Sequence, residues 1–348
     1  MKKNVVRIGN KLLGGDNPIL IQTMANIKTS RVDEILEMDK DLSELGNDLL
    51  RLSVLDEEDA EAFKYLTSHT STPLIADIHF NYLFALKAIE NGAAAIRINP
   101  GNIGGEDKLA RVIDLAKKKG IPMRIGINSG SLPTSQVSKK SSVEAYIDTL
   151  KDTLRVFDKY DYHDLVLSLK SSDPNITYQA YKRAYEEFPY PLHIGVTEAG
   201  EGYLGALKSS VALVPLLREG IGDTIRISLS NPPRDEVIAC KHLLKDMGLR
   251  KNVPTLVSCP TCGRTQVDLM KTVKIVEKHI EKINVDMKIA IMGCPVNGPG
   301  EAKDADLGLA GGVDSFLFFK KDKAIKSMRE EEAVKYLLEQ IDLLASKS

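Results

Sequence analysis

The sequence lacks a net charge that could draw it onto a polyanion. Its 348 residues include 47 Lys and Arg against 48 Asp and Glu, which gives a formal net charge of −1. Global attraction to nucleic acid or to an anionic membrane is therefore excluded, and any anion must be bound by a local cluster of cations. Hydrophobic residues make up 43% and charged residues 27%, a composition typical of a globular protein rather than a disordered one.

Long hydrophobic runs are absent as well. No apolar stretch approaches the roughly 18 residues of a membrane-spanning helix. Residues 1–11 carry basic and amide side chains instead of the apolar region of a signal peptide. We therefore expect a cytoplasmic protein that binds neither membranes nor nucleic acid.

Eight short β-prone segments recur along the first two thirds of the chain. They begin at intervals averaging about 29 residues, close to a strand–helix unit of roughly 30 residues. The intervening segments 32–45, 108–119 and 143–157 carry apolar residues at three- and four-residue spacing, as helices packed on a sheet do. The pattern predicts an α/β fold, a (β/α)8 TIM barrel over residues 1–245. The predicted strands are 19–24, 49–54, 74–79, 94–99, 123–128, 164–170, 192–197 and 223–228.

The pattern changes after residue 249 and predicts a second, smaller α+β domain over residues 250–348. Strands are expected at 253–258, 287–292 and 315–319, and helices at 266–283 and 331–344.

Polar residues gather where the predicted barrel strands end, which is where TIM-barrel enzymes place their chemistry. Five of them are cations, and the planar guanidinium of arginine suits bidentate contacts to phosphate. The cluster favours a polyanionic ligand; the alternative is that arginine–carboxylate pairs only stabilise the barrel. The residues concerned are Arg51, Asp77, His79, Arg97, Asn99, Arg124, Asn128, Lys170, Glu198, Arg226 and Ser228.

Cysteine is scarce, and four in a chain of this length exclude a disulfide scaffold. Three lie within 36 residues: Cys259 and Cys262 in a Cys-Pro-Thr-Cys sequence, and Cys294 in a Gly-Cys-Pro sequence. This set favours an iron–sulfur cluster first, a structural zinc second, and a dithiol redox pair last, since a dithiol leaves Cys294 unexplained. No fourth ligand is evident, because His279 lies in a predicted helix and Cys240 is expected to be a core residue.

Five motifs follow one another along the chain: Arg97-Ile-Asn-Pro-Gly-Asn102, Leu192-His-Ile-Gly-Val-Thr-Glu-Ala-Gly200, Gly220-Ile-Gly-Asp-Thr-Ile-Arg-Ile-Ser228, Cys259-Pro-Thr-Cys-Gly-Arg264 and Met292-Gly-Cys-Pro-Val-Asn-Gly-Pro-Gly-Glu-Ala302. Together they resemble the 4-hydroxy-3-methylbut-2-enyl diphosphate synthase family of the methylerythritol phosphate route to isoprenoids, in its two-domain bacterial form. The resemblance implies a barrel joined to a reductase-like domain that holds a [4Fe–4S] cluster. The family's substrate is 2-C-methyl-D-erythritol 2,4-cyclodiphosphate, whose ring opens with addition of two electrons and loss of water.

The resemblance also implies which residues bind these groups. The cluster ligands would be Cys259, Cys262, Cys294 and the carboxylate of Glu301, which is a harder and more exchangeable ligand for iron than thiolate. The positions that match the family's diphosphate-binding residues are Arg51, Arg97, Arg124, Asn128, Lys170, Arg226 and Ser228.

Further roles follow from the same resemblance. Glu198 would be the acid that protonates the departing hydroxyl; alternatively, it forms a salt bridge with one of the arginines. Asp77 and His79 would shape the site, and Asn297 would contact substrate or cluster-bound oxygen. The family suggests flavodoxin or ferredoxin as electron donor and a head-to-tail homodimer with shared active sites.

Two other classes of function remain possible from the residues alone. One is an iron–sulfur electron carrier without a substrate of its own, although a carrier needs no arginine-lined barrel. The other is a non-redox barrel enzyme acting on a phosphorylated or pterin-like substrate, with a zinc that only stabilises the small domain. Metal identity and binding of the cyclodiphosphate separate these possibilities.

Overall fold

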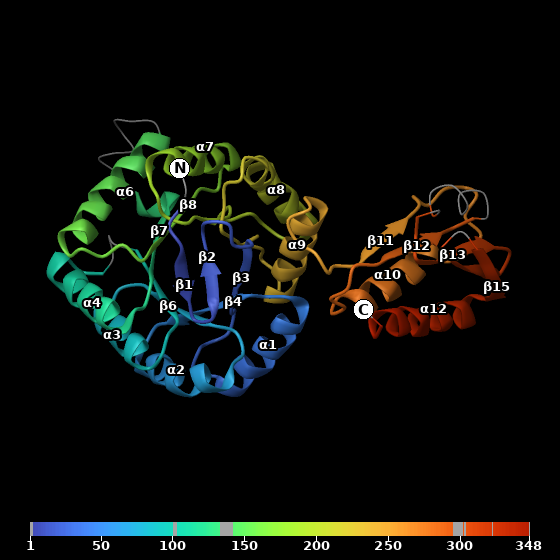
Figure 1. The fold of residues 1–348 in the computed structure, drawn as a ribbon, viewed down its shortest axis with the longest axis horizontal. Coiled ribbons are helices and arrows are strands. Elements are labelled where there is room, and N and C mark those ends of the chain that lie inside the picture. Colours follow the sequence, from blue (N-terminus) through green and yellow to red (C-terminus); the bar gives the residue numbers. More distant parts are fainter. Residues whose placement is uncertain are drawn as a thin grey trace. The chain divides into compact units, whose positions relative to one another are not determined.

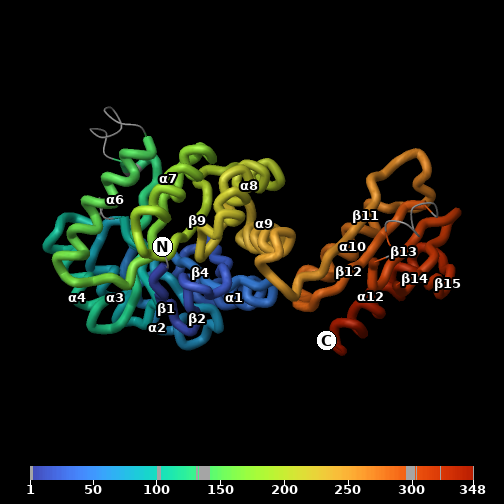
Figure 2. The backbone as a smooth tube through the Cα atoms, turned by 45° about the horizontal axis from the view of Figure 1, so that its top comes forward, coloured from blue at the N-terminus to red at the C-terminus, as the bar shows by residue number. Residues whose placement is uncertain are grey.

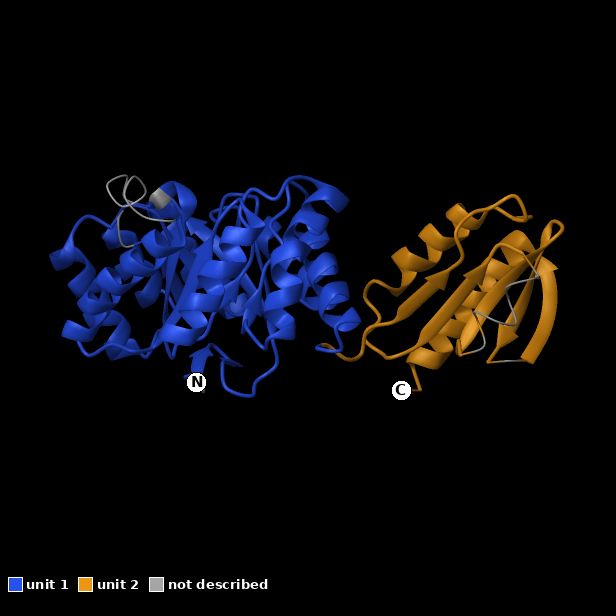
Figure 3. Cartoon of the chain, turned by 90° about the horizontal axis from the view of Figure 1, so that it is seen from above, with its two compact units in different colours: residues 1–249 blue, residues 250–348 orange. Residues whose placement is uncertain are grey.

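The computed structural model describes residues 3–99, 103–132, 142–294, 302, 304–321 and 323–347. The chain divides into two compact units, Met1–Leu249 and Arg250–Ser348 (Figure 3). A short connection leads from the last helix of the first unit to the first strand of the second (Figure 2). Within the described part of the chain, no helix combines the length and apolar character needed to cross a bilayer.

Eight parallel strands form the barrel of the first unit, and the predicted TIM barrel is confirmed (Figure 1). A backbone bridge between Leu167 and Leu192 completes the ring. The strands are β3 (Leu20–Met24), β4 (Leu49–Val54), β5 (Leu74–Ile78), β6 (Ala95–Ile98), β7 (Met123–Asn128), β8 (Leu165–Lys170), β9 (His193–Ile194) and β10 (Thr224–Ile225).

Strands β9 and β10 are shorter than the predicted segments 192–197 and 223–228. Gly195 follows β9 and packs so closely on its neighbour that a Cβ there would lie 2.5 Å from the Arg226 carbonyl oxygen. Backbone hydrogen bonds continue singly beyond the regular ladder, from Arg226 N to Ile194 O at 3.1 Å and from Thr197 N to Ser171 O at 3.2 Å. The barrel wall therefore persists here in irregular form.

Helices alternate with the strands and surround the barrel (Figure 1). Local signals set their ends: the Asp56 side chain accepts a hydrogen bond from Asp59 N at the start of α2, and Gly46, with φ of 102°, ends α1. The helices are α1 (Val32–Leu45), α2 (Glu57–His69), α3 (Tyr82–Glu90), α4 (Glu106–Lys119), α6 (Ser142–Lys159), α7 (Pro174–Glu187), α8 (Gly202–Arg218) and α9 (Pro233–Asp246), with a short 3₁₀ turn at Ser129–Ser131.

A hairpin that the sequence analysis did not predict closes the amino-terminal end of the barrel. Strands β1 (Val6–Ile8) and β2 (Lys11–Leu13) pair antiparallel around Gly9, whose φ is 57°. Their inward side chains join one apolar residue from each of five barrel strands in a buried cluster, the barrel floor, made of Val6, Ile8, Leu13, Leu20, Leu49, Ile75, Ala95 and Val166. The barrel is thus open only at the carboxyl ends of its strands.

The second unit is a five-stranded sheet in the order β11-β12-β13-β14-β15. The first three strands are parallel and the last three antiparallel. Helices α10 and α12 contact each other and pack on this sheet. The elements are β11 (Thr255–Ser258), α10 (Leu269–Ile280), β12 (Lys288–Met292), β13 (Leu307–Gly312), β14 (Ser315–Lys320), β15 (Lys323–Arg329) and α12 (Glu330–Ala345).

The three strands predicted in this unit are present as β11, β12 and β14, but β13 and β15 were not predicted, because they carry weak strand signals. Strand β13 is rich in glycine, and the reason is steric: a Cβ at Gly308 would lie 2.2 Å from the Phe319 ring. Strand β15 is a lysine-rich edge strand with most side chains exposed, so it lacks the apolar alternation of a half-buried strand.

Candidate active site

Each strand that contributes an apolar residue to the barrel floor carries a polar residue two positions later. Because side chains alternate along a strand, these polar residues face the interior nearer the mouth. Apart from the half-buried Arg51, they are almost inaccessible to solvent. The polar residues are Gln22, Arg51, Asp77, Arg97 and Ser168.

Asp77 on β5 holds two of the predicted cations. Its carboxylate lies 3.6 Å from Arg51 Nε and 3.2 Å from Arg97 Nη1, and it is 3% exposed. Burial acts to raise the pKa of Asp77, but Arg51, Arg97 and Arg124 together outweigh burial and keep that pKa below its usual value. Asp77 is therefore a charged anchor for arginines on the neighbouring strands.

Arg226 is held by a carboxylate that the sequence analysis missed. Glu236 on α9 accepts two hydrogen bonds from the Arg226 guanidinium, at 2.8 and 2.9 Å, and a third from the Thr23 hydroxyl at 2.6 Å. The available signal was its position, since Glu236 shares the buried face of the helix with Cys240 and Leu244 at four-residue spacing. A carboxylate on an apolar helix face predicts a buried cationic partner.

Arg124 and Lys170 are both buried, and no carboxylate oxygen of the described residues lies within 4 Å of either. Burial, followed by the surrounding arginines, holds the pKa of both side chains well below their ordinary values. Glycines provide the space for this crowding: a Cβ at Gly126 would lie 2.6 Å from Arg97 Nε, and one at Gly195 would lie 2.7 Å from Lys170 Nζ.

His193 on β9 is a second buried polar residue that the sequence analysis did not place in the site. Its Nδ1 lies 2.6 Å from the Thr224 hydroxyl. Burial, with the charges of Arg124 and Lys170 next in size, keeps the pKa of His193 well below 6.5. A neutral imidazole therefore lines the barrel among the cations.

The remaining predicted residues lie around the mouth with different exposure. Asn128 pairs in register with Lys170 and is half-buried, as is Ser228, whereas Asn99 is buried. His79 is exposed, with its ring centroid 5.4 Å from that of Phe80.

Glu198 is exposed in the turn after β9, with a left-handed φ of 53°. Lys208 Nζ donates to its backbone carbonyl at 3.0 Å. Across the described ranges, no cationic nitrogen lies within salt-bridge distance of its carboxylate, so the structure gives no support to the salt-bridge alternative.

In the second unit, two predicted cysteines follow neighbouring parallel strands. Cys259 comes directly after β11 and Cys294 two residues after β12, and the register pairs Ser258 with Ile291. Gly293 N donates to Cys259 Sγ at 3.2 Å. Cys240 is buried in the barrel core, as expected.

Cys262 is exposed. The backbone N–H of Arg264, and next its guanidinium, lower the pKa of the Cys262 thiol. The same guanidinium also interacts electrostatically with Cys294 and Cys259.

The three thiols form a soft donor set that suits iron or zinc, and the N–H directed at Cys259 Sγ is the kind of contact that supports a metal-bound thiolate. The described side chains do not by themselves form a group of three metal-ligating residues around one point. Glu301 and Asn297 lie outside the described residues.

A parallel barrel with a cation-lined mouth, followed by an α+β unit with thiols at its strand ends, defines a two-domain class of TIM-barrel protein. Two family models match this chain, the GcpE TIM-barrel domain over residues 3–241 and the GcpE protein C-terminal domain over residues 255–343. The chain belongs to the GcpE family.

Named relatives agree with that assignment. The chain is 47% identical over 343 residues to the 4-hydroxy-3-methylbut-2-en-1-yl diphosphate synthase (flavodoxin) of Malacoplasma penetrans, covering 98% of this chain and 95% of the relative. It is 46% identical over 338 residues to the protein of the same name from Clostridium tetani, covering 97% of both. The resemblance found in the sequence is confirmed.

Solved structures support the fold alone. A dihydropteroate synthase from Stenotrophomonas maltophilia aligns with a TM-score of 0.52 at 15% identity, covering 72% of this chain and 100% of that one. The enzyme from Xanthomonas albilineans aligns with a TM-score of 0.50 at 14% identity, covering 71% and 97%. The common feature is the TIM barrel.

Proposed function

We propose that this protein is an iron–sulfur oxidoreductase that converts 2-C-methyl-D-erythritol 2,4-cyclodiphosphate to 4-hydroxy-3-methylbut-2-enyl diphosphate in isoprenoid biosynthesis. Relatives with 42–47% identity over nearly the whole chain bear the name of that synthase. The observation that carries the proposal is the charge at the barrel mouth: among the described residues, three of the five cations pair with two carboxylates, Asp77 and Glu236, and Arg124 and Lys170 have no carboxylate within 4 Å. A diphosphate supplies the negative charge that this arrangement lacks.

In this proposal, residues 1–245 form the substrate-binding domain. The paired arginines Arg51, Arg97 and Arg226 are held in fixed directions, so that they can receive phosphate oxygens without reorganising. Arg124 and Lys170 add charge with which no carboxylate of the described residues forms an ion pair. The proposed binding set is Arg51, Asp77, His79, Arg97, Arg124, Asn128, Lys170, Arg226, Ser228 and Asn297.

Residues 250–348 would hold a [4Fe–4S] cluster through Cys259, Cys262, Cys294 and Glu301. When bound, the cluster would pass the two electrons of the reductive ring opening, one at a time, from the electron-donor protein to the substrate. The protein's own contribution is to stabilise thiolates, by the Gly293 N–H on Cys259 and by the positive charge of Arg264.

Glu198 is proposed as the acid that protonates the departing hydroxyl. Its left-handed backbone conformation is unfavourable for a residue with a side chain, and such strain often marks a functional position. We expect Glu198→Gln to bind the cyclodiphosphate normally and to lose about 10²–10⁴ in turnover rate. Near-wild-type turnover would show that another group donates the proton.

The proposed partners are a flavodoxin, as the names of the relatives indicate, or a ferredoxin, and a second copy of this chain in a head-to-tail homodimer. Helix α8 supports self-association, because it exposes Tyr203, Leu204, Leu207 and Val211 at 57–75% on neighbouring turns, and exposed apolar patches commonly mark interfaces. The proposed location is the cytoplasm. Sedimentation of the wild-type protein and of Leu207→Glu tests the dimer, which the substitution should weaken.

The deciding experiment measures iron, sulfide and zinc in protein purified without oxygen, followed by turnover of the cyclodiphosphate. About four irons and four sulfides per chain, as a [4Fe–4S] cluster requires, together with turnover support the proposal. One zinc without sulfide, persisting after anaerobic reconstitution, overturns the redox function. If Glu301→Ala leaves both cluster content and turnover intact, the carboxylate ligand is wrong.

A further inference from the structure

The five cations of the barrel interior are supported in different ways. Asp77 pairs with Arg51 and Arg97, and Glu236 pairs with Arg226. Arg124 is held instead by an uncharged group. The Gln22 Oε1 atom accepts a hydrogen bond from Arg124 Nη1 at 2.6 Å.

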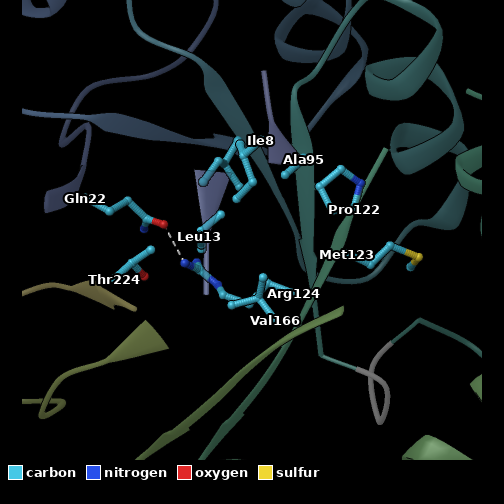
Figure 4. A pocket seen from close by; sticks show the side chains of 10 residues that line it. Ile8, Leu13, Gln22, Ala95, Pro122, Met123, Arg124, Val166 and Thr224 are labelled. Carbon is cyan, nitrogen blue, oxygen red and sulfur yellow. Dashed lines mark hydrogen bonds between the residues drawn. The ribbon is translucent and has the colours of Figure 1, made fainter. Parts of the chain in front are cut away.

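Gln22 and Arg124 meet inside the barrel, from strands β3 and β7 (Figure 4). Gln22 is 1% exposed and Arg124 5% exposed, so water does not compete for the contact. Ile8, Leu13 and other floor residues line a cavity next to them of only about 10 Å³, which is too small for a substrate. On the other side of the guanidinium, Nη2 lacks a hydrogen-bond partner among the described residues, and no described carboxylate forms an ion pair with Arg124.

The chemical identity of residue 22 decides the charge of this pair. A carboxylate would accept the same hydrogen bond with the same side-chain length, as Glu236 does for Arg226, but it would neutralise the guanidinium. An amide fixes the geometry and leaves the full positive charge. In a poorly solvated interior, that difference acts strongly on any anion bound at the mouth.

We propose that Gln22 is a positioning residue that orients Arg124 through a neutral contact and thereby keeps its charge available to the substrate's diphosphate. This inference rests on the proposed function. It goes beyond the proposed function by giving Gln22 a distinct role: Arg124, held by a neutral amide, keeps a charge that no described carboxylate pairs with, whereas Arg51, Arg97 and Arg226 are oriented by carboxylates.

Calorimetric binding of the cyclodiphosphate to the oxidised holoenzyme tests this inference, because binding does not require electrons. Gln22→Glu should raise Kd and KM by about 10- to 100-fold, since an opposing charge within hydrogen-bond reach of the guanidinium competes with phosphate. It should leave the melting temperature at or above that of wild type, because the hydrogen bond is retained. Gln179→Glu, the same change at an exposed position on α7, is the matched control and should change neither constant.

A purely structural role for Gln22 predicts the opposite result, namely Gln22→Glu binding as tightly as wild type, and that result would overturn the inference. If Gln22→Glu does not fold, Gln22→Leu decides: leucine is neutral and close in size but has no hydrogen-bond acceptor. Unchanged binding in Gln22→Leu would overturn the positioning role, and weaker binding with kcat little changed would support it. Failure of the wild-type protein to bind the cyclodiphosphate would instead refute the proposed function itself.

Discussion

The barrel mouth and the thiol-bearing strand ends of the second unit both lie at the carboxyl ends of parallel strands, but the fold supports them differently. In the barrel, Asp77 and Glu236 are buried and hold arginines by ion pairs, so the site exists before a ligand arrives. In the second unit, Cys262 is exposed and Cys259 half-buried. The anion site is preorganised by protein charges, whereas a thiol site of this kind is completed by the group that it binds.

The largest effect should come from removing one thiol. We expect Cys294→Ala to abolish iron incorporation and turnover while leaving the affinity for the cyclodiphosphate unchanged, because the barrel needs no cluster to hold its cations. Iron analysis and calorimetry on the same preparation measure both quantities. Cys240→Ala is the matched control, since Cys240 is a core residue and should retain iron; a parallel loss of affinity in Cys294→Ala would show that the two sites are not independent.

A stability effect comes next. Asp77→Asn removes the anchor of Arg51 and Arg97 and leaves a half-buried and a buried cation without an ion pair, which should lower the free energy of unfolding by about 3–5 kcal/mol. Denaturant unfolding measures the change. Glu187→Gln, which breaks ion pairs with Arg183 and Lys151 at the surface, should have a much smaller effect, and equal effects would refute the view that the mouth is preorganised by charge.

Adding a methyl group at a glycine beside a barrel arginine should have a smaller effect, on the affinity for the cyclodiphosphate. A Cβ at Gly126 would lie 2.6 Å from Arg97 Nε, so Gly126→Ala must displace that guanidinium and should weaken cyclodiphosphate binding about tenfold, in line with the roughly 1–3 kcal/mol of other overpacked sites. Gly130→Ala is the control, because no atom of the described residues lies within 4 Å of its Cβ position. Similar dissociation constants for the two variants would mean that Arg97 is not fixed tightly.

The smallest expected effect is the uptake of protons when the cyclodiphosphate binds. Burial, and then Arg226 and Arg51, hold the pKa of Lys170 well below its ordinary value, so part of the population is neutral above that lowered pKa. A bound diphosphate favours the ammonium form and raises the pKa again, so binding should take up protons. At about pH 8, where imidazole and phosphate have finished titrating, the calorimetric enthalpy should therefore depend on the buffer's ionisation enthalpy.

Lys170→Arg controls this measurement, because arginine stays charged at every working pH. Proton uptake should vanish in that variant. An equal uptake in both proteins would assign the proton to another group, such as His193.

Sequence alone located all eight barrel strands, because each apolar run ends in a polar residue and recurs at a regular interval. It also identified the cations at the strand ends. It missed Glu236, although a carboxylate on the buried face of a helix is a usable signal, and it could not identify Gln22 as a support, because the Gln22–Arg124 pairing joins residues from different elements. Strands β13 and β15 were not predicted. Close packing requires glycine in β13 and edge exposure favours lysine in β15, and neither residue type is a strand signal.

The hairpin β1–β2 has an electrical consequence as well as a structural one. Its apolar side chains and those of the barrel floor form a layer of low polarisability directly beneath the cations. Electric field lines are deflected away from material of low dielectric constant and concentrate in the neighbouring solvent. The floor therefore acts as an insulator that directs the positive potential out through the open end, so that a diphosphate is attracted from only one direction.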